Sequence, residues 1–279
     1  MSQTNTSQTA FPPIAFIGGG NMASAIMGGL IQQGVPASNI TVVEPFEAAR
    51  EALKTNFGID ALPAATNALQ TAQLVVWAVK PQSFKDAAAP VAAFTQSALH
   101  LSVAAGITTD SVAGWTGTQR IVRAMPNTPA LVGKGITGLF ARPEVDAAGK
   151  ALIEAVIGST GECVWVEREE QLDAVTAMSG SGPAYVFLFL EAMTQAGVDM
   201  GLSAEQSYKL AVATFAGGSE LAARSHESAE VLRQRVTSKG GTTYAAITHM
   251  QENKLPEIFI AALRKAEARA KELAIEFGK

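Results

Sequence analysis

Short apolar runs alternate with amphipathic stretches through the first half of the chain. The run from Ile14 to Ile17 is typical of a buried strand, and a helical pattern from Asn21 to about Gln33 follows three consecutive glycines. An amphipathic helix is expected at residues 47–56, and further strand-length apolar runs lie at 40–43, 74–79, 99–104, 120–124, 136–141 and 163–166. Strands and helices that alternate at this spacing predict βαβ units and a parallel sheet.

The second half of the chain shows helical periodicity and no convincing strand. The expected helices lie at residues 183–196, 204–224, 229–236, 243–253 and 257–277. Mixed strands and helices followed by helices alone favour two domains. We therefore predict an α/β protein with a parallel-sheet domain at residues 14–168, an all-helical domain at 169–279 and a disordered polar tail at 1–13.

Two of these helical segments lack a polar face. Tyr185 to Leu190 is apolar all round, and Leu210 to Gly218 is rich in alanine and glycine. Such helices are normally buried or span a membrane, and these are far shorter than the roughly 20 apolar residues that a bilayer requires. A small helical domain has little room for two buried helices, so we expect a homodimer interface there. A compact monomeric bundle is the alternative.

Composition narrows the class of protein. Hydrophobic residues make up 48% and charged residues only 16%, against about 25% charged in typical domains, which is consistent with a surface that another subunit covers. The net charge is −4 and no basic stripe appears, which argues against a nucleic-acid partner. The first thirteen residues lack the charge and apolar run of a secretory signal. Because Cys163 is the only cysteine, we expect a reducing compartment. No stretch approaches the roughly 20 apolar residues that span a bilayer, so we expect a cytoplasmic location and no membrane partner.

A dinucleotide fingerprint, Gly18-x-Gly20-x-x-Ala23, follows the first predicted strand. In a Rossmann-type domain the first glycine allows the tight turn, the second lets the backbone approach the pyrophosphate, and Ala23 permits close helix packing. The phosphates then lie against free N–H groups at the start of the helix, where we place Asn21 and Met22 as cofactor residues. A glycine turn after a strand can also be no more than a turn.

Two later strand ends are expected to face the same cofactor. Glu44 ends the second strand, where a carboxylate hydrogen-bonds the ribose hydroxyls of NAD and repels a 2′-phosphate. It therefore favours NADH, unless it is only a solvated strand end. Val79, Lys80 and Pro81 close the third strand, and the carboxyl ends of parallel strands border the ligand. Lys80 either meets a phosphate or lies in solvent.

Three further motifs are candidates for the substrate side. The loop at residues 125–129, which contains Asn127, is a rigid connection or a wall of the site, and residues 179–183 allow close backbone approach or simply begin a helix. The most informative motif runs from Ser238 to Thr243, between two helices. Its hydroxyl and N–H groups gather at a helix N-terminus, and Lys239 adds positive charge. A small carboxylate is the expected guest, with phosphate as the competitor.

The residues that are lacking also restrict the reaction. His100, His226 and His249 are the only histidines, and none lies in a glycine-rich loop. No hydrolytic triad and no Cys/His pattern with metal-ligand spacing is present, so we expect no metal site. Hydride transfer to an electrophile that is already activated, such as a protonated imine, needs little acid–base machinery and can rest on positioning.

Together, these motifs resemble those of pyrroline-5-carboxylate reductases. The motifs that carry the resemblance occur in the family's order at residues 16–23, 79–82, 102–106, 125–129, 179–185 and 238–243. The resemblance implies reduction of 1-pyrroline-5-carboxylate to L-proline by NADPH, the last step of proline biosynthesis. It also implies an N-terminal Rossmann domain and a helical C-terminal domain that forms dimers, which in many members assemble into a decamer.

The resemblance also assigns roles to the last motif. It implies that the substrate carboxylate is bound by Ser238, Lys239, Gly240, Gly241, Thr242 and Thr243, and that Thr243, the expected catalytic residue, hydrogen-bonds the ring nitrogen. Many members carry proline where Lys239 stands. NADPH-using members place Ser or Arg near the 2′-phosphate, where this chain has Glu44-Pro45-Phe46. We therefore expect both NADP(H) and NAD(H) as cofactors.

Two other functions are disfavoured. A β-hydroxyacid dehydrogenase has the same two-domain plan but needs a lysine and an asparagine where this chain has Val186 and Leu190. A regulatory protein that senses dinucleotides without turnover would keep Gly18, Gly20 and Glu44 but would not need the motif at 238–243. A cofactor-oxidation assay distinguishes these functions.

Overall fold

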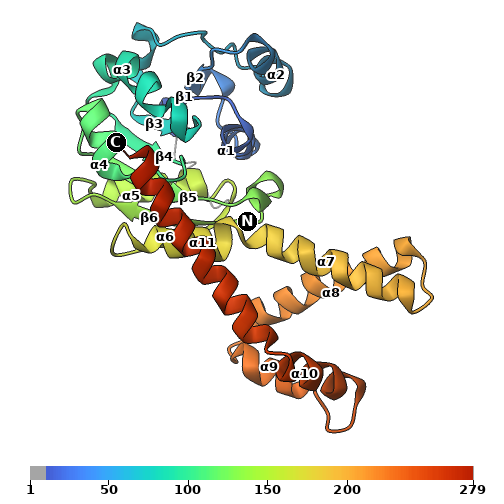
Figure 1. The fold of residues 1–279 in the computed structure, drawn as a ribbon. Coiled ribbons are helices and arrows are strands. Elements are labelled where there is room, and N and C mark those ends of the chain that lie inside the picture. Colours follow the sequence, from blue (N-terminus) through green and yellow to red (C-terminus); the bar gives the residue numbers. More distant parts are fainter. Residues whose placement is uncertain (1–10, 279) are drawn as a thin grey trace, which may run out of the picture. The chain divides into compact units, whose positions relative to one another are not determined.

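Seven strands form one sheet, and each lies at one of the predicted apolar runs. In the computed structural model, which describes residues 11–278, the strand order is β2-β1-β3-β4-β5-β6-β7 (Figure 1). The strands are β1 (Ile14–Ile17), β2 (Ile40–Val43), β3 (Leu74–Trp77), β4 (Leu99–Ser102), β5 (Ile121–Met125), β6 (Gly135–Ala141) and β7 (Gly161–Trp165).

One pair of strands departs from the predicted parallel arrangement. All neighbours are parallel except β5 and β6, which pair antiparallel with Met125 opposite Gly138. The segment between them, residues 126–134, is shorter than the dozen or more residues that a parallel crossover requires. The expectation of an entirely parallel sheet is therefore wrong at this pair.

Eleven helices accompany the strands in the described part of the chain. They are α1 (Asn21–Gln32), α2 (Glu47–Phe57), α3 (Phe84–Thr95), α4 (Thr109–Thr116), α5 (Ala147–Ile157), α6 (Gln171–Val175), α7 (Gly182–Asp199), α8 (Ala204–Arg224), α9 (Ala229–Arg235), α10 (Thr242–Glu252) and α11 (Leu255–Phe277). Helices α3, α4 and α5 fall between predicted strands, where the alternation requires crossover connections. The helices of the second half begin and end within a few residues of their predicted bounds.

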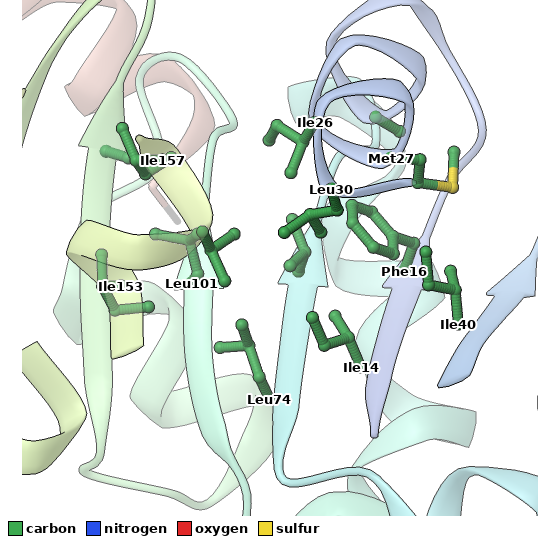
Figure 2. Packing of buried hydrophobic residues seen from close by; sticks show 14 of the residues in the cluster. Ile14, Phe16, Ile26, Met27, Leu30, Ile40, Leu74, Leu101, Ile153 and Ile157 are labelled. Atoms are coloured by element: carbon green, nitrogen blue, oxygen red, sulfur yellow. The ribbon is translucent and has the colours of Figure 1, made fainter. Parts of the chain in front are cut away.

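Alternate residues of the central strands point into two separate hydrophobic core layers, one on each face of the sheet. Ile14 and Phe16 of β1 point to the layer that contains Ile26 and Leu30 of α1, which Figure 2 shows closing over the strand. Ala15 and Ile17 point to the opposite layer. Since side chains along a strand alternate between faces, β1 is buried on both, as is typical of a sheet covered by helices on both sides.

The second layer contains a buried histidine with a structural function. His100 of β4 is fully buried, and its Nδ1 accepts a hydrogen bond from Trp77 Nε1 at 3.1 Å. Its Nε2 lies 3.1 Å from the carbonyl oxygen of Thr95 and donates to it, because Nδ1 is the acceptor. Burial lowers the pKa of His100 to about 4. The imidazole is therefore neutral at pH 7 and fully hydrogen-bonded.

The chain divides into two compact units whose bounds differ from the predicted domains. The sheet unit comprises residues up to Gly180 together with Ala266 onwards, and the helical unit comprises Ser181–Lys265. The compact sheet unit therefore extends beyond the predicted range 14–168. Leu172 of α6 is fully buried, and the end of α11 returns to α4, where Ser111 Oγ donates to the carbonyl oxygen of Gly278 at 2.8 Å.

The predicted disordered tail is too long by at least its last residues. Residues 1–10 lie outside the described part of the chain. Phe11 packs against the core, and its carbonyl oxygen accepts from Asn39 Nδ2 at 2.7 Å. The carbonyl oxygen of Pro13 accepts from the N–H of Gln73 at 2.9 Å. These contacts order residues 11–13, so the tail prediction is wrong for them.

Within the helical unit, α7 and α8 pack closely, yet each leaves apolar side chains uncovered. Gly197 of α7 lies so near α8 that a Cβ atom would stand 2.4 Å from Ser207 Oγ. On the outer faces, however, Leu188 is 63% exposed and Leu221 is 70% exposed. No helix among residues 11–278 combines the length and apolar character needed to cross a membrane. An apolar surface of this kind is typical of a protein interface.

Candidate active site

The glycine turn joins the ends of three strands. Gly18 has φ +95°, a left-handed conformation, and a Cβ atom there would stand 2.6 Å from the carbonyl oxygen of Ala78, just after β3. The Gly18 N–H donates to the carbonyl oxygen of Val43 at the end of β2, at 2.9 Å. Only glycine fits this position without strain. The turn therefore lies at the carboxyl ends of β1, β2 and β3, where open α/β sheets bind their ligands.

The start of α1 has the properties of a phosphate site. Gly20 is the N-cap residue, no side chain caps the helix, and its first turn holds no acidic residue. A Cβ atom at Gly20 would meet nothing within 4 Å, so the space that a ligand would fill is open. The N–H groups of the first turn, including those of Asn21 and Met22, have no partner within the helix. Free N–H groups at a helix start suit the phosphates of a dinucleotide, and contact of Asn21 and Met22 with the cofactor stays a prediction.

Glu44 is buried and accepts two hydrogen bonds that the sequence does not predict. It is 6% exposed, and its Oε2 accepts from the N–H of Gly19 at 2.8 Å while Oε1 accepts from the N–H of Phe46 at 3.0 Å. The carboxylate therefore holds the glycine turn and the loop after β2 together. Each oxygen keeps a second lone pair for another donor, so binding of ribose hydroxyls stays a prediction. The alternative of a solvated strand end is wrong.

The turn after β3 is exposed at its lysine. Lys80 is extended, solvent-exposed and the N-cap of a short 3-10 turn, Pro81–Ser83, that leads into α3. Val79 is half-buried and packs against the second core layer. The structure thus places Val79, Lys80 and Pro81 just beyond the end of β3, as predicted, and contact with the cofactor stays a prediction.

Asn127 has a structural role in the loop after β5. Its side chain is buried, and its Oδ1 accepts from the N–H of Ile136 at 3.0 Å. This bond ties the loop to the start of β6 and supports the interpretation of residues 125–129 as a rigid connection. Contact of Asn127 with the cofactor stays a prediction.

Residues 179–183 mark a point of close packing rather than an open loop. They include the end of a π-helical turn, Thr176–Gly180, and the start of α7. A Cβ atom at Gly180 would stand 2.5 Å from Met125 Cε. Gly180 therefore packs closely against the end of a flexible side chain from β5.

The predicted carboxylate site lies at the start of α10, in the helical unit. Gly240 has φ +77°, and the N–H of Gly241 donates to the carbonyl oxygen of Ser238 at 3.0 Å. Gly241 is the N-cap residue, no side chain caps α10, and its first turn, which begins Thr242-Thr243, holds no acidic residue. Ser238, Lys239, Gly240 and Thr242 are exposed, and Thr243 is half-buried. The helix end therefore presents free N–H groups beside hydroxyls and one ammonium group.

Three residues near the nucleotide site were not predicted. A Cβ atom at Gly19 would stand 2.7 Å from Leu53 Cδ1 of α2, so the middle glycine of the run packs closely against this side chain. Phe46 is 73% exposed at the start of α2, and Arg50 Nη1 bonds to the carbonyl oxygens of Glu44 and Pro45. The unbroken run Gly18-Gly19-Gly20 is a sequence signal that could have identified Gly19. The positions of Phe46 and Arg50 depend on how the loop after β2 folds, and no sequence signal indicates them.

Candidate residues fall in both units. The predicted cofactor residues belong to the sheet unit, and the predicted substrate residues belong to the helical unit. Among the described residues, no group of three or more His, Cys, Asp or Glu side chains is arranged to hold a metal ion.

Comparison with known proteins covers both units. Residues 169–273 match the family model for pyrroline-5-carboxylate reductase dimerisation, and residues 13–106 match the model for coenzyme F420-dependent NADP oxidoreductases. The pyrroline-5-carboxylate reductase of Pseudomonas aeruginosa is 43% identical, over 96% of this chain and 99% of that protein. The chain belongs to the pyrroline-5-carboxylate reductase family.

Solved structures of pyrroline-5-carboxylate reductases agree. The enzyme of Coxiella burnetii is 40% identical with a TM-score of 0.87, covering 94% of this chain and 98% of that one. The enzyme of Plasmodium falciparum, with NADP bound, is 27% identical with a TM-score of 0.83, covering 95% of this chain and 99% of that one. The predicted family and fold class are thus confirmed, and the match to a dimerisation model over residues 169–273 supports an oligomer.

Proposed function

We propose that this pyrroline-5-carboxylate reductase converts 1-pyrroline-5-carboxylate to L-proline with NAD(P)H held at the β1–α1 turn. The observation that carries the proposal is the uncapped start of α10, since the residues that the resemblance assigns to the substrate carboxylate lie there. The N–H groups of this turn, with Lys239, suit a small carboxylate. The reduced cofactor, once bound, would supply a hydride to the imine carbon.

The chain's own residues have little chemistry to perform beyond positioning. A cyclic imine that carries a proton on its nitrogen is already an electrophile, so binding and orientation account for much of the rate. We assign the orienting contact to Thr243, whose hydroxyl hydrogen-bonds the ring nitrogen of the substrate. Ser238, Gly240, Gly241 and Thr242 hold the carboxylate at the same turn.

The proposed reaction is tested by oxidation of reduced nicotinamide, followed by absorbance, with 1-pyrroline-5-carboxylate as substrate. We expect turnover with both NADPH and NADH, and the ratio of their kcat/KM values defines the preference. Oxidation of neither cofactor in the presence of the imine would refute the proposed function and favour a protein that only senses dinucleotides.

Replacing Thr243 with alanine is expected to lower kcat/KM by about 10- to 100-fold, since the ring nitrogen loses an oriented partner. Steady-state kinetics with saturating cofactor measures this loss. Thr248→Ala, a change of the same type in the same helix, is the control and should retain wild-type kinetics. If Thr243→Ala also retains them, Thr243 has no place in the site.

Assembly and location complete the proposal. The dimerisation domain supports an oligomer, and we propose that dimers assemble further into a decamer, which sedimentation velocity tests directly. A cytoplasmic location is supported by the single cysteine, Cys163, which is free.

A further inference from the structure

The β4–α4 loop (residues 103–108) overlaps a motif, residues 102–106, that is part of neither the glycine turn nor the substrate turn. It begins at the carboxyl end of β4, where the N–H of Val103 donates to the carbonyl oxygen of Trp77, the last residue of β3, at 3.0 Å. The strand order reverses between β1 and β3, and a dinucleotide lies across such a point with its adenosine on the side of the second strand. The loop is therefore on the side that suits the nicotinamide half.

A carboxylate from a distant segment holds the far end of this loop. Thr109, the first residue of α4, donates its N–H to Glu169 Oε1 at 2.8 Å and its hydroxyl to Glu169 Oε2 at 2.5 Å. Glu169 lies 60 residues further along the chain, just before α6. Because its two oxygens take both donors of Thr109, the start of α4 is fixed in position and in orientation.

Glu169 is itself held by a buried arginine in the sheet. Arg123 of β5 donates from Nη1 to Glu169 Oε1 at 3.0 Å, and the two side chains are 7% and 17% exposed. A charge-assisted bond of this kind is stronger than a bond between neutral groups. The carboxylate therefore joins the start of α4 to a strand in the interior of the sheet.

Between its two ends, the loop has little room to adjust. Gly106 has φ +74°, and a Cβ atom there would stand 3.3 Å from Leu273 of α11. Ile107 is fully buried. Since close packing transmits displacements rather than absorbing them, a shift of Thr109 would reach the residues of the loop that face the cofactor edge.

We propose that Glu169 is a positioning residue of the reductase and that its bonds to Thr109 hold the β4–α4 loop in the conformation that receives the nicotinamide half of the cofactor. The proposal rests on the proposed function, because it concerns the cofactor of that reaction. Glu169 acts through the backbone of the loop, and hydride transfer depends steeply on the placement of the reacting groups. Its loss should therefore affect turnover and the nicotinamide half, but not the adenosine half at β2 or the imine at α10.

The test compares Glu169→Ala with the wild type in nucleotide binding and in turnover. By calorimetry without substrate, we expect the Kd of NADPH to rise about fivefold, because the loop must then be ordered on binding. The Kd of 2′,5′-ADP, which lacks the nicotinamide half, should stay unchanged. With both substrates saturating, kcat should fall about tenfold or more, whereas KM for the imine should stay unchanged.

Matched variants separate positioning from folding. Glu169→Gln keeps the bonds to Thr109 through its amide oxygen and nitrogen and loses the charge toward Arg123, so it should recover most of the wild-type kcat. Glu170→Ala removes a carboxylate from the next residue, which is exposed and does not cap α6, and should behave as the wild type. Thr109→Val removes the hydroxyl and keeps the pair with Arg123, so it should show the same selective loss in smaller measure, even where Glu169→Ala does not fold.

Glu169→Ala leaves Arg123 with an acidic neighbour, which favours folding of the variant. Burial raises the pKa of Asp173 in α6, and the nearby charge of Arg123 opposes that shift. Equal weakening of NADPH and 2′,5′-ADP binding, or a lower midpoint of urea unfolding with kcat unchanged, would mean that Glu169 only stabilises the fold. Loss of kcat in Glu169→Gln equal to that in Glu169→Ala would also overturn the proposal. A wild-type protein that binds NADPH but does not reduce the imine would refute the proposed function, and the nucleotide Kd values would still test Glu169.

Discussion

Replacing Gly18 with alanine is expected to destabilise the sheet unit and to abolish cofactor binding in the same variant. The new Cβ atom would stand 2.6 Å from the carbonyl oxygen of Ala78 in a backbone conformation of φ +95°. Left-handed strain and forced overpacking each cost about 1–3 kcal/mol, so we expect a loss of about 3–5 kcal/mol in the free energy of unfolding. Urea unfolding and calorimetric titration with NADPH measure the two effects.

Two matched glycine variants separate folding from binding. Gly20→Ala adds a methyl group where nothing lies within 4 Å, so it should fold normally but bind NADPH more weakly, because the methyl group occupies the space of the pyrophosphate. Gly114→Ala, in α4 and equally unobstructed, should leave both properties intact. If Gly18→Ala folds and binds as the wild type does, the turn has been misassigned.

The second large effect is a loss of stability in acid caused by His100. Its folded-state pKa is about 4, below the value of about 6.5 in an unfolded chain. Between these values the unfolded chain binds a proton that the folded chain does not, so stability falls as pH decreases. Well above pH 6.5, His100 leaves the free energy of unfolding unchanged. Its protonation in the unfolded chain lowers that free energy by about 2 kcal/mol at pH 5 and by about 3 kcal/mol below pH 4.

The measurement is the change in unfolding free energy between pH 7 and pH 5, compared between the wild type and His100→Gln. Tryptophan fluorescence reports the sheet unit, because Trp77, Trp115 and Trp165 all belong to it. The variant should lose about 2 kcal/mol of the pH dependence, whatever its stability at pH 7. His226→Gln, at an exposed position, is the control. An identical pH dependence in all three proteins would contradict the assignment.

Local patterns predicted the nucleotide site better than its cofactor preference. The turn at Gly18 and Gly20 follows from glycine chemistry and from its place after a strand, and the structure shows both the strained backbone and the open space. Glu44 was identified by spacing alone, whereas its bonds to Gly19 and Phe46 depend on how β1 and β2 pack. Spacing indicates which strand ends with a carboxylate, but not what that carboxylate contacts.

The sequence by itself determined the seven strands, the division into a mixed part and a helical part, and the family. Each of these follows from apolar periodicity, glycine turns and motifs that are local in the chain. Only the tertiary structure decided the antiparallel β5–β6 pair, the return of α11 to α4, and the position of Arg50 beside Glu44. The return of α11 to α4 joins segments that are far apart in the chain. The β5–β6 pair and the position of Arg50 depend on how short loops fold. Local sequence patterns do not contain this information.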